Sequence, residues 1–167
     1  MNNRDKLLQL TALRYKNLPL LMETSKGDGG LVGEIVRVHL VTEFLLEELI
    51  RLVLGSNAEA VLGLGLKYSQ KLQLATRMEL ISEFNLLPDH VTGSLRKLNT
   101  LRNRVAHKLN EPVQDDELRE LFVGLDRELP YGDVMHHGQI IGLRRYLAFI
   151  FGSMLPKLES ISSSNEE

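Results

Sequence analysis

The feature that most constrains this chain is the spacing of apolar residues between positions 95 and 109. They fall three or four residues apart, at Leu95, Leu98, Leu101, Val105 and Leu109. At about 100° per residue, this spacing gathers all five on one side of an α-helix, within an arc of about 120°. No alternating pattern of the kind that indicates β-strands competes with the helical ones along the chain. The sequence therefore predicts an amphipathic helix with one buried face, within an all-α fold.

The rest of the chain predicts a bundle of about five to six helices. We expect a single helical domain at 1–159 and a disordered polar tail at 160–167. Further helices are expected at 5–21 with a bend at Pro19, at 34–54, at 66–83, at 115–129, and at 138–155 with its end at Pro156. The 34–54 helix has too many charges for a membrane span, so we expect it to be the buried centre. The apolar 138–155 helix offers either a dimer surface or a face buried within the monomer.

Loops and caps complete this expectation. The glycine-rich stretch at 61–66 lacks the Lys-Ser/Thr ending of a phosphate-binding loop and is expected to connect two helices. Residues 130–133 are expected to form a turn. Asp89 or Thr92 is expected to cap the amphipathic helix at its N-terminus.

Composition narrows the class of protein. A chain of 167 residues suits one domain, and 43% hydrophobic with 25% charged residues is typical of a soluble globular protein. Without cysteine, the chain has no disulfide, no thiol nucleophile and no Cys-ligated zinc, which favours a cytoplasmic location. The first residues lack the pattern of a secretory signal. Because the formal net charge is −2, any contact with RNA must be local.

A local basic stretch does occur on the amphipathic helix. The 13 residues 96–108 contain five cations and no Asp or Glu, namely Arg96, Lys97, Arg102, Arg104 and Lys108. We take Arg96, Lys97, Arg104 and Lys108 as candidate RNA-binding residues. An exposed basic helix face with no such function is the plainer alternative.

Arg102 differs from the other cations because it points partly into the core, about 340° around the helix when Leu95 is set at zero. A buried guanidinium must be hydrogen-bonded, so Arg102 needs a carboxylate from another helix or an anionic ligand. Glu43 and Glu47, four residues apart on the 34–54 helix, are the expected carboxylate partners. Both possibilities stay open at this point.

Arg102, Asn103 and His107 together fit the chemistry of RNA cleavage by its own 2′-hydroxyl. Arg102 suits the phosphate because its planar donors bind two oxygens. His107 suits proton transfer because its reference pKa of about 6.5 lies near neutrality. Asn103, four residues before His107, is expected to support the imidazole or the phosphate. The alternative is an inert helix end at which His107 caps backbone carbonyls.

Geometry restricts how this site can form. Arg102 and His107 lie about 140° apart around a regular helix, so one unbroken helix does not point both at the same atom. Either the helix frays near Val105, or two copies of the chain contribute Arg and His to a shared cleft. The second alternative predicts a homodimer.

The run Arg102-Asn-Arg-Val-Ala-His107 resembles the Arg, polar residue, variable residues, His signature of HEPN domains. Residues 71–80 and 95–103 are similar to the helix pair that precedes this motif in bacterial members. The resemblance implies an α-helical homodimer acting as a metal-independent endoribonuclease, in toxin–antitoxin or phage-defence systems, restrained by an antitoxin or regulatory partner. In one toxin subset a modifiable Tyr follows the His by two residues. This chain has Leu109 there, so that mode of control is not expected.

Two further hypotheses remain beside the enzyme. Mannitol-operon-repressor-like proteins are similar in length and helical character, and would imply a non-enzymatic regulator or protein-interaction module. The weakest alternative is a purely structural helical subunit. No cofactor and no metal are expected, because His39 with Glu43 and the adjacent His136 and His137 lack a surrounding ligand set. His39 is expected to be buried and satisfied, and the other two to be solvated.

Overall fold

The computed structural model describes residues 30–78, 87–108, 110–125 and 127–164, with side chains as far as Met154. Its elements in chain order are α2 (Gly30–Leu54), the 3-10 helix η1 (Gly55–Asn57), α3 (Ala58–Leu62), α4 (Tyr68–Arg77), α6 (Asp89–His107), α7 (Asp115–Arg119), the 3-10 helix η2 (Glu120–Phe122), α8 (Tyr131–Met135) and α9 (Gln139–Ser164). These residues contain helices and turns and no strand, so the predicted all-α class is confirmed. The helix expected at 5–21, with its bend at Pro19, lies outside the described residues.

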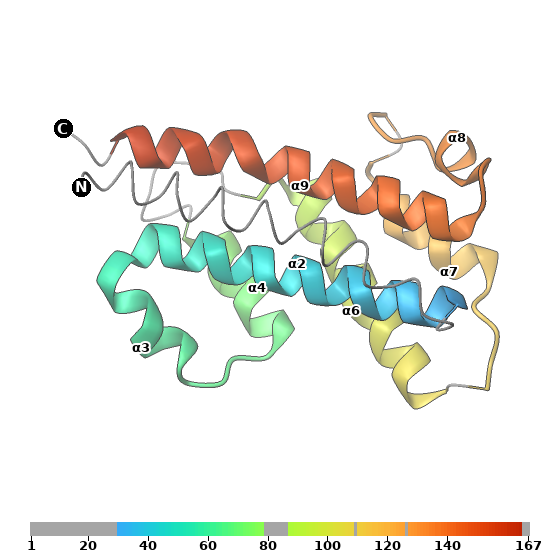
Figure 1. The fold of residues 1–167 in the computed structure, drawn as a ribbon, viewed down its shortest axis with the longest axis horizontal. Coiled ribbons are helices and arrows are strands. Elements are labelled where there is room, and N and C mark those ends of the chain that lie inside the picture. The colour runs from blue at the N-terminus through green and yellow to red at the C-terminus, as the bar shows by residue number, and fades with distance from the viewer. Residues whose placement is uncertain (1–29, 79–86, 109, 126, 165–167) are drawn as a thin grey trace.

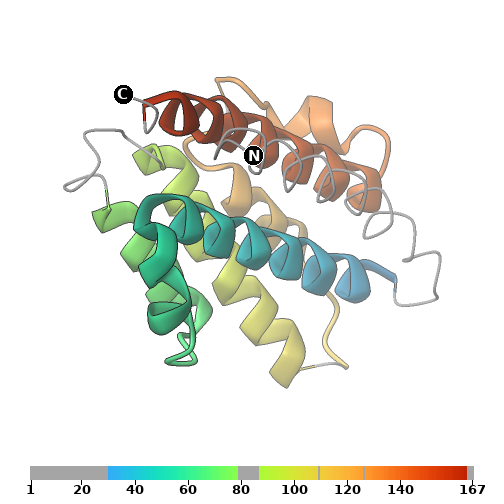
Figure 2. The same cartoon turned by 60° about the vertical axis from the view of Figure 1, so that its left-hand side comes forward.

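The centre of the bundle is α2, as predicted for 34–54, although the helix begins earlier, at Gly30. It packs against α9, α4 and α6. Figures 1 and 2 show α9 lying along α2, while α6 crosses α2 and its C-terminal turns project beyond it. Fully buried side chains along α2 explain this central place, among them Ile35, Val38, Leu46 and Leu49. Among the described helices, none combines the length and apolarity that a membrane span requires.

The apolar arc of α6 forms its contact with the core. Leu95 and Leu98 are completely buried, and Leu101 and Val105 are 5% and 1% exposed. This confirms the helical spacing predicted for these four residues, while Leu109 lies outside the described part. The one completely buried hydroxyl of the helix, Ser94, is also satisfied. Its Oγ donates to the carbonyl of Leu121 and accepts from the hydroxyl of Tyr146 at 2.7 Å.

Most of the apolar face of α9 is buried within the monomer. Leu143, Tyr146 and Ile150 are completely buried, whereas Ile140 and Ile141 at its start stay 38% and 45% exposed. Of the two expectations for this helix, burial within the monomer therefore accounts for most of the face.

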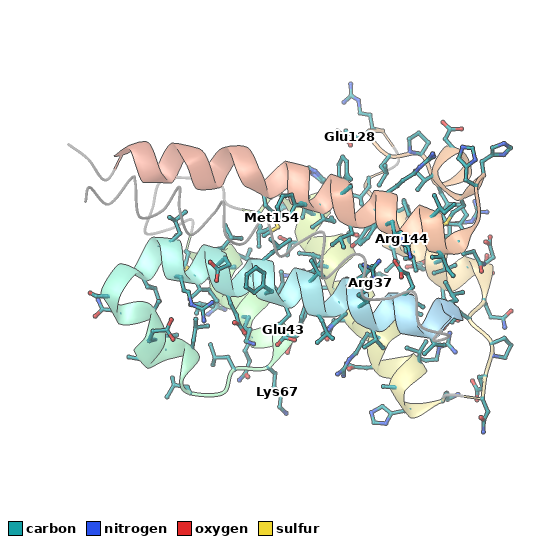
Figure 3. The ribbon with its side chains drawn as sticks, viewed as in Figure 1. Arg37, Glu43, Lys67, Glu128, Arg144 and Met154 are labelled. Atoms are coloured by element: carbon teal, nitrogen blue, oxygen red, sulfur yellow. The ribbon has the colours of Figure 1, made fainter. Side chains whose placement is uncertain are left out.

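A buried carboxylate joins α2 to α9. Glu34 is 4% exposed, and its oxygens accept from Nε of Arg37 at 3.1 Å and Nε of Arg144 at 3.3 Å. Figure 3 shows these two arginines near one another, one on each helix. Such a carboxylate needs this pairing because burial of an unpaired charge is costly.

Several predicted boundaries are wrong, for local reasons. The helix expected at 115–129 is split into α7 and η2, which is followed by a turn at Gly124 with φ of +88°, a left-handed conformation that favours glycine. The turn expected at 130–133 is instead the start of α8, with Pro130 as its N-cap. Pro156 does not end the last helix, because α9 continues to Ser164. Proline removes the hydrogen bond to the carbonyl four residues earlier, and that residue, Gly152, is exposed to water.

The start of α6 also differs from expectation. Pro88 occupies the N-cap position, and neither Asp89 nor Thr92 caps the helix with its side chain. Asp89 instead lies in the first turn, where a negative charge favours the helix dipole.

Candidate functional site

The predicted Arg102–His107 segment forms the last turns of α6. The helix continues without a break to His107, and its C-cap Lys108 has φ of −131° and donates its backbone N–H to the carbonyl of Arg104 at 2.9 Å. The expectation that the helix frays near Val105 is therefore wrong. Val105 is buried in the core and holds this turn in place. In one protomer, Arg102 and His107 thus diverge by about 140° and lie about 7.5 Å apart along the axis.

Arg102 does not bind the carboxylates predicted for it. Glu43 and Glu47 both accept from Nζ of Lys71 on α4, at 2.7 Å and 2.6 Å. Sequence reasoning missed Lys71 because the pairing depends on how α4 packs against α2. Burial lowers the pKa of Lys71, but the hydrogen bonds and charges of the two glutamates outweigh this and leave its pKa above the usual range.

The guanidinium of Arg102 is held on the helix surface instead. The side chain is half-buried, and its Nη1 donates to Oδ1 of Asn103 at 3.0 Å. Within the described residues, no carboxylate lies at salt-bridge distance from Arg102. Its charge is therefore offset there only by the neutral carboxamide of Asn103, and four of its five N–H donors remain for a ligand.

Asn103 and His107 are exposed on the same side of α6, four residues apart. Asn103 contacts Arg102 rather than His107, so within one protomer it positions the guanidinium and not the imidazole. The imidazole of His107 forms no hydrogen bond within the described part of the chain, which argues against the carbonyl-capping alternative.

Three of the four candidate RNA-binding cations are bound to acidic side chains on the opposite side of α6. Nζ of Lys97 donates to Glu120 at 2.5 Å, and Nζ of Lys108 donates to Glu111 at 3.1 Å. Arg104 pairs with Glu117, and both side chains are largely shielded from solvent. Its other terminal nitrogen reaches the carbonyls of Glu111 and Pro112, at 3.5 Å each. These contacts attach the segment after residue 110 to α6.

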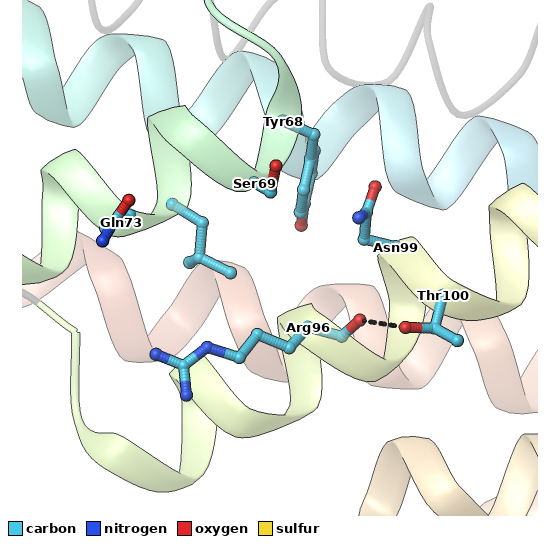
Figure 4. A pocket seen from close by; sticks show the side chains of 7 residues that line it. Tyr68, Ser69, Gln73, Arg96, Asn99 and Thr100 are labelled. Carbon is cyan, nitrogen blue, oxygen red and sulfur yellow. Dashed lines mark hydrogen bonds between the residues drawn. The ribbon is translucent and has the colours of Figure 1, made fainter.

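Arg96, the fourth cation, lies on the other side, beside a surface pocket of about 370 Å³ between α4 and α6. Figure 4 shows Tyr68, Ser69 and Gln73 of α4 facing Arg96, Asn99 and Thr100 of α6. Leu72 completes the lining, which includes no acidic residue. Arg96 is exposed and has no carboxylate partner among the described residues.

Behind this pocket lies His39 of α2, which is 2% exposed. Its Nε2 lies 3.1 Å from Oδ1 of Asn99, and its ring stacks on Tyr68 at a centroid distance of 4.1 Å. Since an amide oxygen only accepts, Nε2 carries the proton and donates. The Nδ1 atom is buried without a hydrogen bond among the described residues. The sequence prediction of a buried histidine is therefore confirmed, but one of its nitrogens is unsatisfied.

The environment of His39 favours its neutral form. Burial lowers its pKa below the usual value, and the hydrogen bond to Asn99 opposes this shift only in part. The positive charge of Arg102 lowers the pKa further.

The other histidines considered from the sequence lie elsewhere. His136 and His137 are exposed after α8, with ring centroids 5.1 Å apart. Within the described residues, no three His, Asp or Glu side chains are grouped closely enough to hold a metal ion.

Comparison with known proteins found no match to this chain among protein-family models, curated proteins or solved structures.

Proposed function

We propose that this protein is a metal-independent endoribonuclease of the HEPN type, with its site at the C-terminal end of α6. In this proposal Arg102 binds the phosphate, His107 transfers protons, and Asn103 positions Arg102. The observation that supports it most strongly is that Arg102 and His107 lie at the projecting end of α6 without carboxylate partners in the described residues. An arginine without a carboxylate partner and a histidine without a hydrogen bond are available to an anionic substrate.

The divergence of Arg102 and His107 on an unbroken helix favours a site made by two copies. In a symmetric dimer formed through these turns, His107 of one copy faces Arg102 of its partner, and the symmetry repeats the pair. Each of the two sites then holds one imidazole and one guanidinium, contributed by different copies. The imidazole accepts the proton of the 2′-hydroxyl and, as an imidazolium, returns a proton to the leaving 5′-oxygen, while the guanidinium stabilises the charge on phosphorus.

The reaction needs no metal for these steps because the side chains supply the base, the acid and the positive charge. Cleavage by this path leaves a 2′,3′-cyclic phosphate and a 5′-hydroxyl. The motif resemblance supports a toxin or phage-defence role, in which a partner protein or antitoxin would restrain the nuclease.

A second candidate is a non-enzymatic regulator or protein-interaction module. It is favoured by the exposed apolar pair Ile140 and Ile141, which suits a protein contact. Under this alternative the α6 end has no chemistry to perform.

The experiment that separates the two is RNA cleavage in EDTA. Wild type, His107→Ala and His136→Ala are compared on a labelled structured RNA, the last as a control at another exposed histidine. We expect wild type and His136→Ala to leave 2′,3′-cyclic phosphate ends and His107→Ala to be inactive. Absence of cleavage by wild type over a broad RNA panel would contradict the enzyme and favour the regulator.

A further inference from the structure

The pocket between α4 and α6 has the dimensions of a small-ligand site. Its volume of about 370 Å³ lies within the range typical of such sites, roughly 300–1,000 Å³. Tyr68 and Leu72 of α4 are its apolar lining residues, and the other side chains of the lining are polar or charged. Such a lining suits a planar group that has hydrogen-bonding edges.

Hydrogen bonds within the protein orient two polar side chains of the pocket, those of Asn99 and Thr100. Because Oδ1 of Asn99 accepts from His39, the amide of Asn99 keeps its two N–H donors for a ligand. The hydroxyl of Thr100 donates to the carbonyl of Arg96 at 3.1 Å, so its oxygen remains an acceptor. Gln73, exposed on the opposite wall, offers both a donor and an acceptor. A nucleobase edge presents a matching set of donors and acceptors.

The charge of the pocket selects an anion. Arg96 is the charged residue of the lining, which has no carboxylate. A planar base joined to a phosphate satisfies both the amides and the guanidinium.

The pocket lies on the same side of α6 as part of the proposed cleavage site. Arg96, Asn99, Asn103 and His107 lie on one polar stripe of α6, between about 40° and 120° around the axis, when Leu95 is set at zero. Asn103 follows Arg96 by seven residues, or about 10 Å along the helix. An RNA strand that lies along this stripe extends from the pocket to the turn of Asn103, which holds Arg102. In the proposed site, Arg102 binds a phosphate of that strand.

We propose that the α4–α6 pocket binds one unpaired nucleotide of the RNA substrate near the cleaved linkage, with Asn99 and Gln73 on its base and Arg96 on its phosphate. This inference rests on the proposed endoribonuclease function, because it assigns a subsite to that same substrate. Single-stranded bases of RNA are accessible to such recognition, whereas paired bases are not.

Calorimetric titration of the full chain tests the subsite without requiring cleavage. The probes are adenosine, guanosine, cytidine and uridine 5′-monophosphate, the four nucleosides, and inorganic phosphate. Gln73→Ala and Arg96→Gln alter exposed side chains of the pocket, and Lys97→Gln is the matched control on the opposite side of α6. Asn99 is left intact because it binds the buried His39.

We expect saturable binding of at least one monophosphate, weakened roughly tenfold or more by Gln73→Ala and by Arg96→Gln. Lys97→Gln should bind as wild type does. Phosphate alone should bind more weakly than the nucleotide. No binding of any monophosphate, equal binding of phosphate alone, or binding unchanged in Gln73→Ala would overturn the subsite.

Binding and cleavage assays together distinguish failure of the nucleotide subsite from failure of the endoribonuclease proposal. If RNA cleavage depends on His107, but Gln73→Ala binds nucleotides and cleaves RNA as wild type does, the endoribonuclease proposal is retained and the pocket is not its subsite. If nucleotides bind through Gln73 and Arg96 while no RNA is cleaved, the pocket is a nucleotide site and the endoribonuclease proposal fails.

Discussion

The two polar sides of α6 have similar compositions and different surroundings. On one side, Lys97, Arg104 and Lys108 each bind a carboxylate from the segment that follows the helix. On the other, Arg96 has no carboxylate partner among the described residues and His107 is exposed. Arg102, at the edge of the buried face next to this side, also has no carboxylate partner there. A count of basic residues in the sequence treats all of these alike.

The difference arises from where the chain goes after α6. The segment after residue 110 folds back along one side of the helix, and η2 contacts α6. Its glutamates at positions 111, 117 and 120 therefore reach only the cations on that side. The paired side therefore stabilises the fold, while the other side is available for a ligand.

Removing Arg102 should produce the largest effect on activity. We expect Arg102→Ala to lower the rate of RNA cleavage about a hundredfold or more, because a preorganised positive charge on the phosphate is lost. Lys97→Ala, a cation of the paired side, should cleave within about twofold of wild type. Initial rates of cleavage of one labelled RNA measure both variants. Equal losses of rate in the two would contradict the distinction between the paired side and the ligand side of α6.

Removing Arg104 should instead affect the stability of the fold. Its side chain is 19% exposed and pairs with that of Glu117, which is 32% exposed. We expect Arg104→Ala to lower the free energy of unfolding by about 1–2 kcal/mol, because a shielded charge-assisted pair is lost. Arg102→Ala should change it by less than about 0.5 kcal/mol. Urea denaturation measures both, and a larger loss in Arg102→Ala would contradict our assignment of roles.

A smaller effect is expected from pH, on the stability of the fold. The pKa of His39 is lower in the folded protein than in the unfolded chain, so the unfolded state binds more protons in mildly acid solution. Stability is fully present above the unfolded pKa of about 6.5 and is lost as pH falls below it toward the folded pKa. The urea midpoint of wild type should therefore fall on acidification. His39→Gln should weaken this dependence, whereas the exposed His107→Ala should retain it.

The sequence predicted those features that depend on local periodicity. The spacing of Leu95, Leu98, Leu101 and Val105 predicted both the helix and its buried arc, and the structure confirms them. The central place of α2 followed similarly from its apolar residues.

Features that depend on contacts between distant segments were not predictable. The partner of Glu43 and Glu47 is Lys71, which a pattern within α2 or α6 does not indicate. The pairing of Arg104 with Glu117 depends on how the chain turns after residue 110. The contact of His39 with Asn99 joins residues 60 positions apart. Each is a tertiary contact, and helical periodicity contains no information about it.

The central claim is that Arg102 and His107 act across two copies of the chain, and mixing two inactive variants tests it most directly. Arg102→Ala and His107→Ala proteins are each assayed alone, then unfolded together, refolded and assayed again on the same RNA. If the site is shared, about half of the dimers are mixed and each has one intact site, so about a quarter of the wild-type rate should return. A mixture no more active than its two components, although wild type cleaves after the same refolding, would contradict the account.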